Sequence, residues 1–164
     1  MIEDLLDSPG WMVAIVVGYG AFLIAIAAYD ARRRRVPNVA IYPAIAVALG
    51  LAFVRPDGPW WSFVLAGVAA AALFVALGVA SRGGMGMGDA KLAAFIGLMT
   101  GWPGVLVAVF VAFAVGAAAG LMLIAAGRLE RREPLPFAPA LAVGALAAAA
   151  AGRQLAGLLW PGIA

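Results

Sequence analysis

The segment GMGMGDAKL, residues 84–92, opens a stretch of the chain in which no residue from 92 to 127 is charged. One transmembrane helix takes about 20 apolar residues to cross about 30 Å of hydrocarbon, so this stretch is long enough for two crossings. The sequence GWPG at residues 101–104 separates them, because glycine and proline interrupt helices. We therefore predict a short helix from Gly88 to Thr100 and a longer one from Val105 to Ala126.

The composition of the whole chain also indicates insertion into a membrane. Of its 164 residues, 66% are hydrophobic and 12% are charged, whereas a soluble domain carries about 25% charged residues. The chain has no cysteine and no histidine, which removes the thiolate and imidazole ligands of metal sites and the commonest general base. We expect no metal and no cofactor, so any chemistry has to use carboxylates, hydroxyls, lysine or backbone groups.

Four more apolar segments bring the predicted number of membrane-spanning helices to six. They are Trp11–Tyr29, Val39–Val54, Trp60–Ala80 and Phe137–Leu159. The first of them ends at Asp30, shortly before four consecutive arginines at residues 32–35. We expect an all-α, polytopic membrane protein in which a single domain covers residues 1–164.

The basic residues predict how the chain is oriented in the bilayer. Nine of the 11 Lys and Arg residues fall on one side, namely residues 32–35, Arg82, Lys91, Arg128, Arg131 and Arg132. Loops rich in Lys and Arg remain in the cytoplasm. We therefore expect both termini to lie outside. The net charge of +3 then reflects topology, and we expect contact with lipid but not with nucleic acid.

Two aspartates share the predicted cytoplasmic face. An acid within the membrane costs at least about 2.5–3.5 kcal/mol, so it is a candidate functional residue. Asp89 follows Gly86 and Gly88, where missing side chains would let another chain's backbone come close. Asp30 and Asp89 within hydrogen-bond distance would share one proton, so that one activates water while the other polarises a carbonyl. The alternative is that each acid merely pairs with a neighbouring basic residue at the interface.

Three motifs in this order resemble those of the type IV prepilin peptidases, which are intramembrane aspartyl proteases of the GxGD class. The motifs are Asp30 with RVPN at 35–38, GMGDAKL at 86–92, and PFAP at 136–139. The resemblance implies that Asp30 and Asp89 are the catalytic pair. It also implies cleavage of the short basic leader of prepilins or pseudopilins after a glycine, at the cytoplasmic face of the prokaryotic inner membrane. Substrate-binding or supporting roles would fall to Gly86, Gly88, Lys91, Pro37, Asn38, Pro136, Phe137 and Pro139.

The chain departs from the long-form prepilin peptidases near its start. Those enzymes carry an extra N-terminal region, usually with a four-cysteine zinc site, that is linked to methylation of the new N-terminus. Here the first helix already leads to Asp30, and there is no cysteine. We expect the short, peptidase-only form of Flp (tight-adherence) pilus systems and archaeal preflagellin peptidases, without N-methyltransferase activity.

Two other functions remain open at this point. Tyr29-Asp30, the GMGD at 86–89 and Pro139-Ala140-Leu141 also match the signatures of presenilin and signal-peptide peptidases, although those enzymes usually have nine spans. A small proton-coupled transporter also uses acids within the membrane, but here both acids lie at one face. Among supporting residues, Lys91 either tunes the pKa of Asp89 or extends to lipid headgroups. Asn38 either forms a hydrogen bond near Asp30 or caps the second helix, and we favour the cap.

Overall fold

The computed structural model describes residues 10–55, 58–81, 85–127 and 136–159. These residues form helices without any strand, which confirms the all-α prediction. The elements are α2 (Gly10–Arg33), α3 (Asn38–Val54), α4 (Trp60–Ala80), α5 (Met87–Ala125) and α6 (Ala138–Leu159). Four of the basic residues used to predict the orientation, Arg82, Arg128, Arg131 and Arg132, lie outside the described residues.

The helices have the length and surface of a multi-pass membrane protein. Residues Val13–Arg33 of α2, together with α4 and α5, are long and apolar enough to cross a bilayer, while α3 and Ala138–Gly152 of α6 are shorter apolar helices. Large apolar side chains such as Val39, which is 89% exposed, cover the outside of the bundle. Exposing such side chains to water costs about 25 cal/mol per Å², whereas lipid solvates them.

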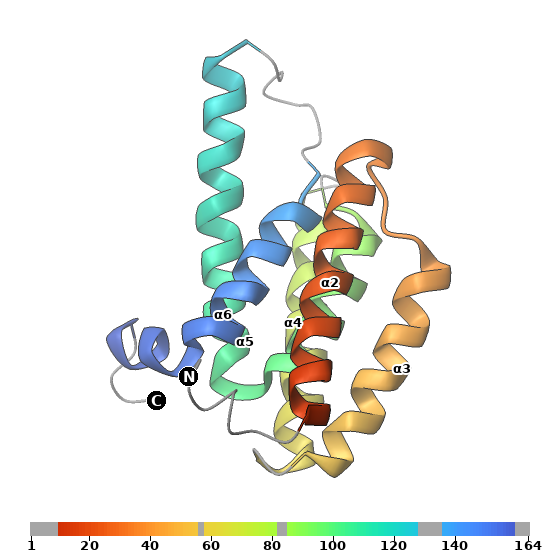
Figure 1. Cartoon of the computed structure of the whole chain (residues 1–164). Coiled ribbons are helices and arrows are strands. Elements are labelled where there is room, and N and C mark those ends of the chain that lie inside the picture. The colour runs from red at the N-terminus through yellow and green to blue at the C-terminus, as the bar shows by residue number, and fades with distance from the viewer. Residues whose placement is uncertain (1–9, 56–57, 82–84, 128–135, 160–164) are drawn as a thin grey trace.

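Helix α5 supplies the fourth and fifth predicted crossings. Figure 1 shows its two halves running in opposite directions, with the turn between them at the end of the bundle where α2 begins. The chain leaves helical geometry at Gly101, which has a φ of 62°. Met99 has no helical donor for its carbonyl, because residue 103 is a proline without an N–H. The Arg55 guanidinium donates to that carbonyl over 2.6 Å and lies 4.6 Å from the Phe63 ring centroid.

Close backbone packing places α5 at the centre of the bundle. Its first half lies against α4, where a Cβ on Gly97 would come within 2.5 Å of the Ala66 carbonyl oxygen. Its second half lies against α6, where a Cβ on Gly144 would collide with the Ala108 carbonyl oxygen. Glycine at such positions lets helix backbones approach closely. The turn in α5 therefore gives each of its halves a different partner helix.

Helix α2 is held differently from the others. Its backbone approaches α6, but among the described residues none of its Cα atoms lies within 8 Å of a Cα in α3, α4 or α5. Contact with α5 is made by large rings instead: the Tyr19 and Phe22 centroids lie 5.6 and 5.0 Å from that of Phe95. The middle of α2 is therefore joined to α5 by side chains rather than by backbone packing.

The predicted end of the first helix at Asp30 is wrong. The helix continues to Arg33, because arginine is a good helix former and is favoured in a last turn, near the negative end of the helix dipole. It ends where Arg34 takes a left-handed conformation, with a φ of 52°, and donates its N–H to the Asp30 carbonyl over 2.7 Å. The last helix has the predicted bounds to within one residue, and α6 is kinked at Ala151.

Candidate active site

Asp30 lies in the last turn of α2 with its side chain directed into the bundle. It is 4% exposed, and among the described residues it is the one charged side chain that is buried. Its Oδ2 accepts a hydrogen bond from the backbone N–H of Ala138 over 3.3 Å. Ala138 is the first residue of α6, where N–H groups lack helical partners and the helix dipole is positive. The start of α6 therefore gives the buried Asp30 side chain a hydrogen-bond donor.

Asp89 is the third residue of α5 and is partly buried. Its Oδ2 accepts the Gly86 N–H over 3.3 Å, and its own N–H donates to the Gly86 carbonyl over 3.0 Å. An acid in the first turn is favoured by the same dipole. Asp30 lies close enough to Asp89 for the two carboxyl groups to interact electrostatically. The fold thus brings both acids together, each beside the start of a helix.

The two glycines before Asp89 have different surroundings. A Cβ on Gly88 would lie 3.0 Å from the Cβ and 3.3 Å from the backbone nitrogen of Val36, in the turn between α2 and α3. The expected space for another chain's backbone is therefore filled at Gly88 by the protein itself. A Cβ on Gly86 would have the Asp89 carboxylate, at 3.4 Å, as its nearest neighbour. At Gly86, room for a substrate stays a prediction.

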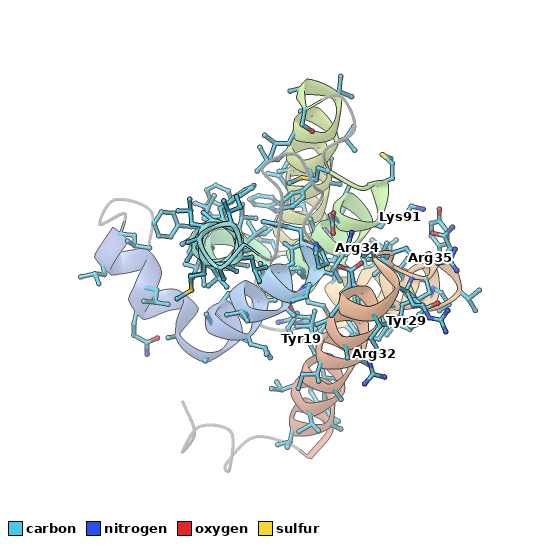
Figure 2. All side chains as sticks on the ribbon, turned by 90° about the horizontal axis from the view of Figure 1, so that it is seen from above. Tyr19, Tyr29, Arg32, Arg34, Arg35 and Lys91 are labelled. Atoms are coloured by element: carbon cyan, nitrogen blue, oxygen red, sulfur yellow. The ribbon has the colours of Figure 1, made fainter. Side chains whose placement is uncertain are left out.

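Lys91 and Asn38 bind each other. The Lys91 Nζ donates to the Asn38 Oδ1 over 2.8 Å and lies 4.7 Å from the Tyr42 ring centroid. Figure 2 shows Lys91 extending from α5 toward α3. The prediction that Asn38 caps its helix is wrong, because Pro37 is the N-cap and makes no side-chain capping bond. The Asn38 side chain is instead directed at a neighbouring helix.

The PFAP segment fixes the start of α6. The Phe137 ring lies 5.8 Å from Phe74 and 5.4 Å from Phe113, centroid to centroid. This ring cluster positions the next residue, Ala138, whose N–H reaches Asp30. Pro136 precedes α6 and Pro139 lies in its first turn, where a missing N–H costs nothing. Sequence reasoning missed Ala138, since a backbone donor has no side-chain signature of its own.

Comparison with known proteins gives consistent matches. Residues 17–121 match the model of the type IV leader peptidase family. Prepilin leader peptidase/N-methyltransferase of Bacillus subtilis is 36% identical over 129 residues, which cover 78% of this chain and 52% of that protein. The proteins of that name from Dickeya chrysanthemi and Pseudomonas aeruginosa are 32% and 29% identical, over 87% and 81% of this chain and 52% and 48% of their own lengths. The chain spans about half the length of these three relatives. No solved structure gives a significant match.

Proposed function

Because the chain belongs to the type IV leader peptidase family, we propose that it is an intramembrane aspartic endopeptidase that removes the basic leader of prepilins or pseudopilins after a glycine. The observation that carries this proposal is that Asp30 and Asp89, from separate helices, lie at one end of the bundle, close enough for their carboxyl groups to interact electrostatically. The names of the similar proteins support the class of substrate.

The reaction needs one of the two carboxyl groups ionised and the other protonated. The ionised group takes a proton from water, whose oxygen then bonds to the scissile carbonyl carbon, while the protonated group donates to the carbonyl oxygen. The C–N bond breaks as the leaving nitrogen receives a proton from the pair. Within the described residues, Asp30 and Asp89 each use Oδ2 to bind a backbone N–H. In the proposed reaction, water and substrate bind at the Oδ1 atoms.

We place this acid pair at the cytoplasmic face of the inner membrane, with both chain termini outside. The arginines at residues 32–35 directly follow the helix that carries Asp30, and such residues stay in the cytoplasm. Exposed tryptophans mark the opposite end of the bundle, at the starts of α2 and α4 and at the turn within α5; they are Trp11, Trp60, Trp61 and Trp102. Tryptophan is enriched at membrane interfaces, which supports a spanning orientation.

The test is cleavage by the purified protein in bilayers. The substrate is a synthetic peptide with a basic leader, a glycine and an apolar helix, and mass spectrometry detects the released leader. Asp30→Asn and Asp89→Asn should each slow cleavage at least about 100-fold, since each removes an acid–base group. Circular dichroism checks that both variants keep their helices. Cleavage near the wild-type rate in either variant would reject the aspartyl pair, and equal cleavage of a peptide without the glycine would favour a presenilin-like specificity.

A further inference from the structure

The turn between α2 and α3 is attached to the start of α5 by two contacts. Val36 fills the space beside Gly88, and the Asn38 side chain accepts a hydrogen bond from the Lys91 ammonium group. We propose that Lys91 and Asn38 are positioning residues, which clamp this turn onto α5 and thereby set the separation of the two acids. The catalytic part of this inference rests on the proposed function, and its structural part does not.

The clamp acts where the backbone of α2 has no close contact with that of α5. None of the Cα atoms of α2 lies within 8 Å of a described Cα of α5. The nearer of its two ring contacts, Phe22 with Phe95, lies about 12 Å along the helix axis from Asp30, at about 1.5 Å per residue. Near the acids, α2 is joined to α6 by the hydrogen bond between Asp30 and Ala138, and to α5 through the turn that follows Arg33.

The contacts of the clamp lie on matching helix faces. Gly88 and Lys91 are three residues apart on α5, so they share the face that receives the turn. Asn38 and Tyr42 are four residues apart on α3, and the Lys91 ammonium contacts both of them. One lysine thus joins α5 to α3 within two residues of Asp89, and α3 is linked to α2 by a short turn.

Positioning and substrate binding by Lys91 predict different kinetics. Lys91→Met keeps an unbranched side chain of similar length but removes the amine. If Lys91 positions the acids, kcat should fall by about 10- to 100-fold with KM unchanged, because small displacements of catalytic groups slow the chemical step. If Lys91 binds the substrate, KM rises instead, and the proposal is rejected.

Variants at Asn38 provide the matched control. Asn38→Asp keeps an acceptor oxygen for the ammonium group, so it should retain more of the wild-type kcat than Asn38→Leu. Asn38→Leu has similar size but no acceptor and should lose as much as Lys91→Met. The double variant Lys91→Met with Asn38→Leu should be no worse than either single one, because both remove the same bond. Additive losses would show that the two residues act separately, against the clamp.

A distance measurement tests the clamp without any cleavage assay. Because the chain has no cysteine, cysteines can be introduced at the exposed residues Ala31 and Met87 and spin-labelled without background. The distribution of distances between the two spin labels should be narrow when the rest of the chain is unchanged, and also with Asn38→Asp. It should be broad with Lys91→Met or Asn38→Leu. An unchanged distribution in the last two would overturn the clamp. This readout stands even if no variant cleaves the peptide, so it separates failure of the clamp from failure of the proposed function.

Discussion

The Asp30 carboxylate accepts the backbone N–H of Ala138, 108 residues further along the chain, over 3.3 Å. This bond joins the last turn of α2 to the first residue of α6 in a buried setting. One side chain therefore has both a structural partner and, in the proposed reaction, a chemical role. The two can be separated by choosing replacements that keep or remove the acceptor oxygen.

Asp30→Asn keeps an oxygen that can accept the Ala138 N–H, whereas Asp30→Ala leaves that buried donor unpaired. An unpaired buried donor costs about 1–3 kcal/mol, so the alanine variant should be less stable than the asparagine variant by that amount. The measurement is denaturant-induced unfolding in detergent micelles. Equal stabilities would show that the Ala138 N–H finds another acceptor. Both variants should lack activity.

Gly88→Ala should displace the turn between α2 and α3, because the new Cβ would lie 3.0 Å from the Val36 Cβ. We expect a loss of cleavage activity together with a loss of stability. Gly86→Ala is the matched control, since its Cβ meets the Asp89 carboxylate at 3.4 Å and its backbone is extended, with a φ of −75°. The rate of cleavage and the free energy of unfolding should both be lower for Gly88→Ala than for Gly86→Ala. A rise in KM confined to Gly86→Ala would support a substrate backbone passing that glycine.

Arg34 ends α2 in a left-handed conformation, with a φ of 52°, that costs a residue with a side chain about 1–2 kcal/mol. Arg34→Gly and Arg34→Ala both remove the guanidinium and its interactions, so their difference isolates the backbone effect. The glycine variant should be the more stable of the two by about 1 kcal/mol in an unfolding titration. If the Arg34→Ala variant is as stable as the Arg34→Gly variant, residue 34 does not end the helix in a left-handed conformation.

Arg55→Met should destabilise the turn within α5 without affecting chemistry. It removes the donor to the Met99 carbonyl, and a carbonyl left without a partner costs about 1–3 kcal/mol. Arg55 follows the far end of α3, about 25 Å from the helix start at 1.5 Å per residue. Cleavage per folded molecule should therefore match wild type, while the unfolding midpoint falls. A selective loss of kcat at unchanged stability would contradict this view.

A reporter that is active only outside the cytoplasm tests the proposed orientation. Fused after Ala164, it should be active, because an even number of crossings returns the chain to the side on which it started. Fused after Arg35 in a truncated chain, it should be inactive, since the arginines at residues 32–35 are expected in the cytoplasm. The opposite pattern would reverse the assignment of the acid pair to the cytoplasmic face.

Local signals explain which helix boundaries could be predicted. The bounds of α4, Trp60–Ala80, and the interruption at Gly101 agree with prediction, because apolar length, proline and glycine act where they stand in the chain. The end of α2 was placed too early, at Asp30. The charge of a run of arginines predicts a loop, but arginines can also continue a helix. The helix ends where Arg34 takes a left-handed conformation.

The amino-acid sequence by itself determined the membrane class, the all-α architecture and the two candidate acids. Bilayer thickness sets the length of an apolar segment, and a carboxylate at the end of such a segment stands out wherever the chain folds. Only the tertiary structure decided the partners: Ala138 for Asp30, Val36 for Gly88, and Asn38 for Lys91. The residues of each pair lie on different elements, far apart in the chain. Their meeting depends on how closely glycine-bearing helices pack around α5, which no local pattern encodes.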